Sequence, residues 1–266
     1  MNFKFKYFDS RSTMLPTPST SHVPFERVYE PAEDSYLLLD TLSSDSEKAF
    51  LRERFTSNSP SPLVVEIGTG SGVVVSFLHA QAEEIFGHSN ILTLGVDVNR
   101  FACKATEQTV VVAEEAQAMQ GVSCGFFLGA VVGDLALSLK PGEVDILVFN
   151  PPYVPTAELP GLPESQDLVD TSSYAGDSHL LSLSYAGGSD GMETTDRLLQ
   201  SLNLIMDKQR GCAYILLCAQ NQPEKVKQGV MEWGNGWAVD TVGTSGMTAG
   251  WEKLQIVRIW RTPYGN

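Results

Sequence analysis

The chain has 266 residues, of which 42% are hydrophobic and 19% are charged, and its formal net charge is −14. This length predicts one large domain or two small ones, with a core that needs no disulfide or metal ion to hold it. The acidic balance argues against a protein that mainly binds nucleic acid, because phosphate contacts require a basic surface. Partners are therefore expected among proteins and small molecules.

Cysteine and histidine usage points away from a metal centre. The four cysteines and four histidines are scattered, with no CxxC pair, which is typical of reduced thiols in an intracellular protein. No apolar run approaches the roughly 18–20 residues that a membrane span needs. The N-terminal stretch MNFKFKYFDS also lacks the apolar segment of a secretory signal. We expect no metal ion, no membrane contact and a location in the cytoplasm, with the nucleus as a second site.

The chain begins with a segment rich in Ser, Thr and Pro, so residues 1–24 are predicted to form a flexible arm ahead of a single domain, 25–266. The domain opens with a helix over 30–42, whose leucines form an apolar face. Strands are expected at 63–68, 90–98, 125–135, 144–150, 212–220, 237–244 and 252–261, and helices at 72–86, 100–120, 192–206 and 223–234.

Continuous apolar strands separated by helices are typical of a parallel sheet that is covered on both faces. The last two strands are separated only by a glycine-containing turn and are expected to add an antiparallel edge. The predicted fold is therefore α/β, a seven-stranded, doubly wound, Rossmann-like sheet. Residues 157–189 are predicted to be irregular, and a loop of that length in a compact domain is usually functional or disordered.

The sequence VVEIGTGSGVV joins the first strand to the next helix and contains Gly68, Gly70 and Gly72. Glycines at this point let a ligand approach the backbone, at the edge of a parallel sheet where ligands bind. A dinucleotide fingerprint would need Gly or Ala at position 73, where this chain has Val73. Glu66, two residues before the first glycine, instead fits the amino-acid end of S-adenosylmethionine. A tight turn that binds nothing is the alternative.

Two further acids follow successive strands. Asp97 ends the second strand, where a carboxylate can accept both hydroxyls of a ribose, and Asp134 follows the third, where it can accept from an adenine amino group. Each acid alone could be a helix cap or a solvated loop residue. Because three acids close three strands at one edge, we interpret them together as a site for S-adenosylmethionine, with S-adenosylhomocysteine as the product.

The fourth strand ends in Asn150, Pro151, Pro152 and Tyr153. A protein that methylates a planar nitrogen must hold its N–H groups, and the side-chain oxygen of Asn150 and the backbone oxygen of Pro151 can each accept one. The two prolines fix the loop, and Tyr153 can stack on the flat target. We predict that these four residues bind the substrate, with Asn150, Pro151 and Tyr153 as the catalytic ones. A plain X-Pro-Pro turn is the alternative.

In this order, EIGTGSG, DVN, GDL and NPPYV resemble the motifs of class I S-adenosylmethionine-dependent methyltransferases that act on a planar nitrogen. Two further segments, VYEPAEDSYLLLDTL and SYAGGSDGMETTDRLL, narrow the resemblance. They are similar to the HemK-like glutamine N5-methyltransferases, in the short eukaryotic and archaeal branch. The resemblance extends over about residues 25–260.

This resemblance implies a substrate, a partner and further site residues. The implied substrate is the glutamine of the Gly-Gly-Gln motif in the class 1 translation termination (release) factor. The implied partner is a small zinc-binding activator subunit, which forms a heterodimer by docking near the third strand. The residues placed around the cofactor by the resemblance are Tyr29, Ser35, Glu66, Gly68, Gly70, Asp97, Asp134, Leu135 and Asn150.

Other hypotheses remain open from the sequence. An adenine-N6 DNA methyltransferase uses the same kind of loop, but it needs a basic groove or an added region to hold a flipped base. Methylation of protein lysine as a side activity is a second alternative. A non-catalytic scaffold would not need Glu66, Asp97, Asp134 and Asn150 together, and Val73 disfavours a dinucleotide oxidoreductase.

Overall fold

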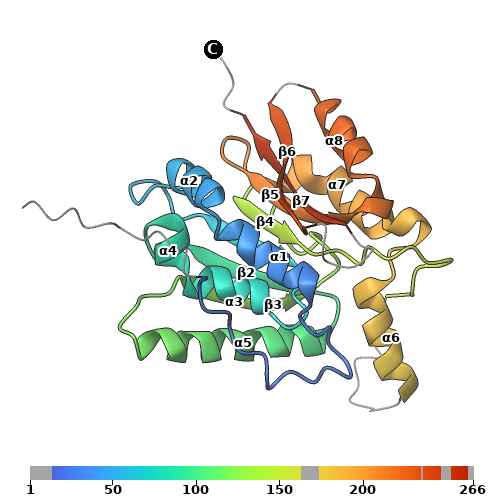
Figure 1. The fold of residues 1–266 in the computed structure, drawn as a ribbon, viewed down its shortest axis with the longest axis horizontal. Helices are drawn as coiled ribbons and strands as arrows, with labels where there is room; N and C mark the ends of the chain where they lie inside the picture. The colour runs from blue at the N-terminus through green and yellow to red at the C-terminus, as the bar shows by residue number, and fades with distance from the viewer. Residues whose placement is uncertain (1–13, 163–173, 235, 247–252, 263–266) are drawn as a thin grey trace, which may run out of the picture.

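The computed structural model describes residues 14–162, 174–234, 236–246 and 253–262. A seven-stranded sheet in the order β3-β2-β1-β4-β5-β7-β6 forms its centre (Figure 1). The strands are β1 (Leu63–Ile67), β2 (Leu92–Asp97), β3 (Phe126–Val132), β4 (Ile146–Phe149), β5 (Cys212–Cys218), β6 (Trp237–Thr244) and β7 (Leu254–Arg261). β7 pairs antiparallel with β5 and β6, whereas the other pairs are parallel. The predicted α/β fold with an antiparallel C-terminal edge is therefore confirmed.

The helices of the described residues are α1 (Glu33–Leu42), α2 (Asp45–Arg54), α3 (Val73–Ala80), α4 (Ala82–Phe86), α5 (Arg100–Ala118), α6 (Tyr174–Tyr185), α7 (Glu193–Ile205) and α8 (Pro223–Met231). Short 3-10 turns, η1 (Ser189–Gly191) and η2 (Ala219–Asn221), precede α7 and α8. None of the described helices is long and apolar enough to cross a lipid bilayer.

Three helical features differ from the sequence prediction. The helix expected over 72–86 is broken at Gln81 into α3 and α4. Helix α2 was not predicted, although its N-cap Ser44 accepts a hydrogen bond from the backbone N–H of Glu47, three residues later. The segment 157–189 was predicted to be irregular, but it contains α6 and the first residue of η1, while its residues 163–173 lie outside the described part.

The flexible arm predicted for residues 1–24 needs correction over its second half. Val23 is buried in a small cluster with Val28 and with Ala105 of α5. The ring nitrogen Nε2 of His22 lies 3.1 Å from the hydroxyl of Thr109, also on α5. This part of the arm therefore packs against the domain, because its apolar and hydrogen-bonding side chains find partners on α5. Residues 1–13 lie outside the described part.

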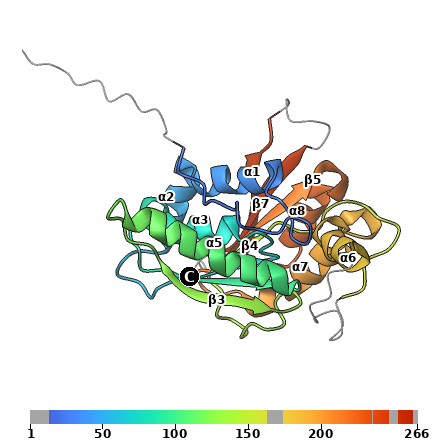
Figure 2. The same ribbon diagram turned by 90° about the horizontal axis from the view of Figure 1, so that it is seen from below.

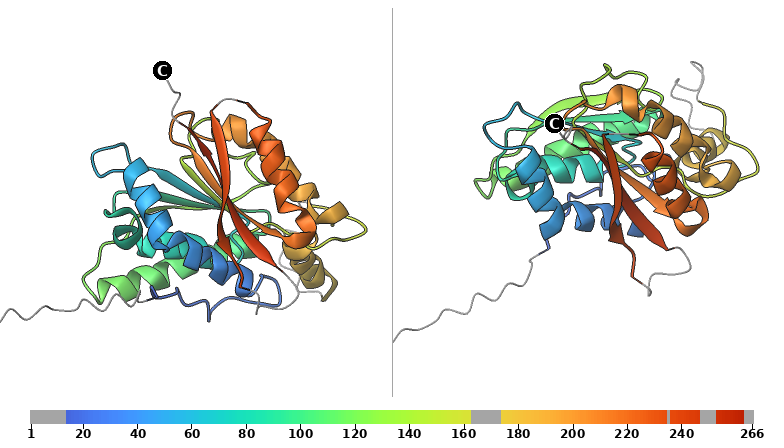
Figure 3. Two further views of the ribbon diagram at one scale, coloured as in Figure 1. Left: turned by 45° about the horizontal axis from the view of Figure 1, so that its top comes forward. Right: turned by 90° about the horizontal axis from the view of Figure 1, so that it is seen from above.

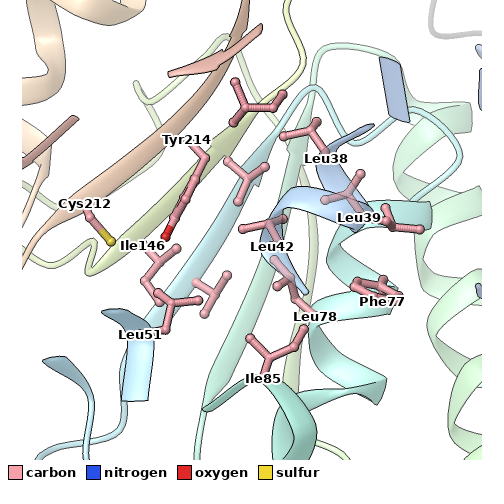
Figure 4. Close-up of a cluster of buried hydrophobic side chains, with 14 of the residues drawn as sticks. Leu38, Leu39, Leu42, Leu51, Phe77, Leu78, Ile85, Ile146, Cys212 and Tyr214 are labelled. Atoms are coloured by element: carbon pink, nitrogen blue, oxygen red, sulfur yellow. The ribbon is translucent and has the colours of Figure 1, made fainter. Parts of the chain in front are cut away.

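Two apolar clusters lie on opposite faces of the sheet, because successive strand residues point to opposite sides. Helices α1, α2 and α3 cover the first face, where their leucines and phenylalanines meet residues such as Ile146 and Tyr214 (Figure 4). Helices α7 and α8 cover the second face over β4, β5 and β7. Figure 3 shows the C-terminal strands between α1 (blue) and α8 (orange). The fold is thus doubly wound, with helices on both faces of the central sheet.

The strand order decides where a ligand can bind. β1 lies between β2 and β4, so the chain winds in one direction from β1 to β3 and in the other from β4 onward. At such a switch point the loops after neighbouring strands diverge and leave a crevice at the carboxyl ends. The loops after β1, β2, β3 and β4 carry the residues that were predicted to form the site.

Candidate functional site

A cavity lies at this end of the sheet and brings together all the predicted site residues except two. It is lined by Tyr29, Ser35, Glu66, Gly68, Gly70, Asp97, Asp134, Leu135, Asn150 and Pro152. Pro151 and Tyr153 are not among the lining residues. Pro151 is buried, and Tyr153 packs against the apolar cluster on the α1 face. The stacking role of Tyr153 and the acceptor role of Pro151 stay predictions.

The glycine loop owes its shape to backbone conformations that other residues rarely adopt. Gly68, Gly70 and Gly72 have φ of 66°, 51° and 77°, in the left-handed region that favours glycine. At Gly72 a side chain would also collide with α5, because an added Cβ would lie 2.6 Å from Cα of Thr106. The loop is therefore packed against α5. Its glycines leave the backbone open to the cavity, which Thr69 and Ser71 of the same loop also line.

Glu66 is almost fully buried at the end of β1. Its Oε2 accepts a hydrogen bond of 2.7 Å from the backbone N–H of Val75, in the first turn of α3. Burial raises the pKa of the Glu66 carboxyl well above its usual range, and the Val75 hydrogen bond only partly opposes this. A cationic group that entered the cavity beside Glu66 would favour the ionised form, so this position suits an ammonium group.

Asp97 holds the loops after β1 and β2 together. One carboxylate oxygen accepts from the backbone N–H of Gly70 at 2.9 Å, and the other from that of Asn99 at 2.8 Å. Burial raises the pKa of Asp97 to about 6, although these two hydrogen bonds act in the opposite direction. Each carboxylate oxygen has a further lone pair, and Asp97 also lines the cavity, so it can still accept hydroxyl groups of a ligand.

The loop after β3 contributes Asp134 and Leu135. Asp134 forms an ion pair with Arg197 of α7, so a ligand amino group would share this carboxylate with a guanidinium group. Leu135 has φ of 51°, in the left-handed region, and it lines the cavity. Such a conformation costs a residue other than glycine about 1–3 kcal/mol and is concentrated at functional sites.

Asn150, the first residue after β4, is held in one orientation by Asp34 of α1. Its side-chain nitrogen donates a hydrogen bond of 3.0 Å to Oδ2 of Asp34. Its carbonyl oxygen Oδ1 is buried and has no hydrogen-bond partner among the described residues. A buried polar atom without a partner costs free energy, so this oxygen is an acceptor that a bound molecule can satisfy.

Asp34 is a site residue that the sequence analysis missed. Besides Asn150, its carboxylate accepts from the hydroxyl of Tyr29 at 3.0 Å and from the backbone N–H of Ser35 at 2.6 Å. The hydroxyl of Ser35 donates to the same group. The sequence did hold a signal, because Asp34 precedes the buried Leu38 by four positions and so lies on the apolar face of α1.

The outer wall of the cavity comes from the segment between β4 and α7. Leu180 and Leu183 of α6 line it, together with Leu159 and Leu162. An ion pair of 2.8 Å between Arg27 and Asp177 ties α6 to the segment before α1. Figure 1 shows this helix beside the body of the molecule. Leu159, Leu180 and Leu183 are partly buried, whereas Leu162 is exposed.

The hydrogen-bond acceptors that line this cavity fit S-adenosylmethionine. Glu66 suits its ammonium group, Asp97 its ribose hydroxyls and Asp134 its adenine amino group, while the glycine loop leaves the backbone open to its amino-acid end. No group of three or more His, Cys, Asp or Glu side chains that could hold a metal ion occurs among the described residues.

The chain is similar to known methyltransferases along most of its length. It is 33% identical over 251 residues to the eRF1 methyltransferase catalytic subunit mtq2 of Schizosaccharomyces pombe, which covers 93% of this chain and 96% of that protein. It is 30% identical to the methyltransferase HEMK2 of Mus musculus, covering 92% and 96% of the two chains. No family model matches the sequence.

The chain belongs to the HemK-like glutamine methyltransferases. A third relative is consistent with the short branch of this family. The release factor glutamine methyltransferase of Bradyrhizobium diazoefficiens is 28% identical over 116 residues, and the match covers 44% of this chain but 34% of that protein. This HemK-like methyltransferase therefore aligns over more than nine-tenths of its length with the two eukaryotic relatives, and over less than half of it with this bacterial one.

S-adenosylmethionine, the cofactor of this HemK-like methyltransferase, supplies an electrophilic methyl group on its sulfonium when bound. Among the residues of the chain, Glu66 and Asp97 would hold the ammonium group and the ribose hydroxyls of the cofactor. Asn150 would offer its buried Oδ1 to the substrate. Asp34 keeps that oxygen pointing into the site by engaging the nitrogen of the same amide.

The affinity for S-adenosylmethionine is expected to fall as the pH falls through about 6. In the assigned site the ribose hydroxyls would donate to ionised Asp97, so binding would lower the pKa of this carboxyl, which burial has raised to about 6. The contribution of Asp97 is thus present above pH 6 and declines below it, by up to about tenfold per pH unit. Calorimetric titration at pH 5, 6, 7 and 8 measures this, and a constant affinity from pH 5 to pH 8 would contradict the assignment.

Asp34→Asn is expected to lower turnover by about 10-fold to 100-fold, because Asn150 then loses the carboxylate that fixes its orientation. The measurement is kcat at saturating cofactor, with cofactor affinity from calorimetry. The matched control is Glu33→Gln, which neutralises the exposed acid next to it in the same helical turn. Equal turnover in the two variants would show that Asp34 does not position the catalytic amide.

Proposed function

We propose that this HemK-like methyltransferase transfers the methyl group of S-adenosylmethionine to the side-chain nitrogen of a glutamine, in the Gly-Gly-Gln motif of the class 1 translation termination factor. The observation that carries the proposal is the buried Oδ1 of Asn150 at the edge of the cofactor cavity, which has no hydrogen-bond partner in the described part of the chain. The names of the relatives, an eRF1 methyltransferase subunit and a release factor glutamine methyltransferase, support the substrate.

The chemistry of an amide nitrogen explains why such an oxygen is needed. The lone pair of the amide nitrogen is delocalised into the carbonyl group, so the nitrogen is a weak nucleophile. An acceptor that takes one of its N–H groups draws electron density toward the nitrogen and holds it in place. The hydrogen bond from Asn150 to the Asp34 carboxylate also polarises the Asn150 amide, which makes Oδ1 a stronger acceptor. When the methyl group is transferred, the sulfonium leaves as the thioether of S-adenosylhomocysteine. The methylated nitrogen then releases one of its two protons to water and keeps the other.

The site does not favour the alternative, an adenine-N6 DNA methyltransferase. Both arginines that line the cavity are in ion pairs, Arg27 with Asp177 and Arg197 with Asp134. Neither is therefore available to phosphate groups unless it gives up its carboxylate. The formal charge of −14 adds a general repulsion of nucleic acid.

The β3 edge of the sheet supports the further proposal of a heterodimer with a small zinc-binding activator subunit. β3 is the outermost strand, and Figure 2 shows it beside α5 at the margin of the molecule. Phe127 contacts His79 on the α5 side, so its neighbours point to the other side of the sheet. Exposed apolar side chains of β3, on either side of the sheet, and of the following loop are Phe126 (61% exposed), Leu128 (55%), Val131 (40%), Val132 (50%) and Leu137 (82%).

An unpaired edge strand with several exposed apolar side chains is unusual in a monomer, because it invites pairing with another chain. A partner that adds a strand to β3 would satisfy its backbone and cover these side chains at once. Because the proposed substrate acts in translation, we also propose that the enzyme works in the cytoplasm, with the nucleus as a second location.

Asn150→Ala is expected to lower methylation of the termination factor by about 100-fold or more while cofactor binding persists, because only the acceptor of the amide N–H is lost. Mass spectrometry of the factor, incubated with enzyme, activator and S-adenosylmethionine, measures one added methyl group on the Gly-Gly-Gln glutamine. No methyl group on that glutamine with the unaltered enzyme, or full activity in Asn150→Ala, would refute the proposal.

Leu128→Glu is expected to weaken binding of the activator by about 10-fold or more, because it would bury a charge in an apolar contact. Size-exclusion chromatography of the mixed subunits and calorimetry measure this. Leu204→Glu is the control, since Leu204 is similarly exposed (62%) but lies on α7. Equal loss in both variants, or loss in neither, would exclude the β3 edge as the docking surface.

A further inference from the structure

The turn at residues 187–191, in the sequence AGGSDG, packs directly against the catalytic loop. A Cβ atom added to Gly187 would collide with the carbonyl oxygen of Pro152, and one added to Gly191 would collide with that of Tyr153. Gly191 also has φ of 68°. These two positions therefore accept only glycine, and the backbone of the turn forms a close-fitting support behind the catalytic loop.

Backbone hydrogen bonds continue this contact beyond the catalytic loop. The N–H of Val154 donates to the carbonyl of Tyr185 at 3.0 Å, and the N–H of Gly187 donates to the carbonyl of Val154 at 2.8 Å. The N–H of Thr156 donates to the carbonyl of Gly188 at 3.0 Å. The two segments thus run side by side like a short piece of parallel sheet.

Asn221, in the turn after β5, joins both segments through one buried side chain, which is 2% exposed. Its Nδ2 donates to the carbonyl oxygens of Tyr153 at 3.1 Å, Asp190 at 3.0 Å and Gly191 at 3.3 Å. Its Oδ1 accepts from the backbone N–H of Cys218 at 2.8 Å. Only a side-chain amide can donate to several carbonyl groups and accept from an N–H at the same place.

We propose that Asn221 is a positioning residue for methyl transfer, which acts by fixing the backbone of the catalytic loop at Tyr153. The inference rests on the function proposed above. The loop has two fixed ends: Asp34 holds Asn150 at one end, and Asn221 holds Tyr153 at the other. The two residues between them are prolines, whose φ angles are restricted, so a shift at one end is passed to the other instead of being absorbed.

Proper alignment of the reacting groups depends on both ends. The Pro151 carbonyl, the predicted second acceptor of the target amide, lies between the two fixed points. A displacement of about 1 Å in a catalytic group can cost about 100-fold in rate. Loss of the Asn221 amide is therefore expected to affect turnover far more than cofactor binding, which uses the loops after β1, β2 and β3.

The test compares Asn221→Ala and Asn221→Asp with Tyr214→Phe. Asn221→Asp keeps the size and the acceptor for Cys218 but replaces the donor with an oxygen that faces three carbonyl groups. Tyr214→Phe is the control, because it removes one buried hydrogen bond, to Glu47, away from the loop. The kcat for the termination factor is expressed per cofactor-binding site counted by calorimetry, so unfolded molecules are not included. Asn221→Ser replaces the alanine variant if that does not fold.

Both Asn221 variants are expected to lose about 10-fold to 100-fold in kcat, with cofactor affinity within about twofold of the unaltered enzyme, whereas Tyr214→Phe keeps its kcat. A kcat within about threefold of the unaltered enzyme in both Asn221 variants would overturn the inference. Hydrogen–deuterium exchange gives a second readout that needs no substrate. Faster exchange of the peptide over residues 150–156 is expected in Asn221→Ala, and unchanged exchange there would also overturn the inference.

The same experiment separates this inference from the proposed function. Failure of the unaltered enzyme to methylate the termination factor would refute the function, whatever the variants do. Normal methylation by the unaltered enzyme, together with normal kcat in the Asn221 variants, would refute only the positioning role.

Discussion

The site depends on one buried carboxylate that joins two distant parts of the chain. Asp34 lies in α1, before the first strand, and its partner Asn150 follows the fourth strand, 116 positions later. The carboxylate accepts from Asn150, Tyr29 and Ser35, so its charge is offset by hydrogen bonds although it is almost fully buried. This arrangement orients the Asn150 amide without any covalent constraint, and it explains why a helix outside the sheet contributes to the candidate site.

The cofactor cavity is built at a cost to the stability of the cofactor-free chain. Burial raises the pKa of Asp97 from its usual value of 3.8 to about 6, so keeping it ionised at neutral pH costs about 3 kcal/mol. The contribution of this carboxyl to the free energy of unfolding is therefore largest below pH 3.8 and is lost as the pH rises through about 6. Hydrogen-bond donors and the positive charge of the cofactor offset the cost when they enter the site. The enzyme is thus expected to gain stability on binding its cofactor, in addition to the usual effect of a ligand.

Much of this arrangement could be predicted from the sequence, because it depends on local patterns. Glycine spacing, apolar strands and the residues that end them place Glu66, Asp97, Asp134 and Asn150 at one edge of a parallel sheet. The contribution of Asp34 could not be derived this way, since it depends on how α1 packs across the sheet. The role of Asn221 could not be predicted for the same reason, because its hydrogen-bond partners come from two other segments. Helix α6 was missed because its serines and glycine resemble loop composition, and α2 because its mainly charged sequence shows little apolar periodicity.

The packing of α1 links the start of the chain to its end during folding. This helix lies against β6 and β7, the last two strands, and Thr41 sits so close to Gly243 of β6 that no larger residue would fit there. When a ribosome makes the chain, α1 emerges first, yet two of the elements it packs against, β6 and β7, are made only after about 200 further residues have been added. Until then α1 lacks its contacts with β6 and β7, which help to hold Asp34 beside Asn150. The last strands of the sheet thus support a cavity to which they contribute no lining residue.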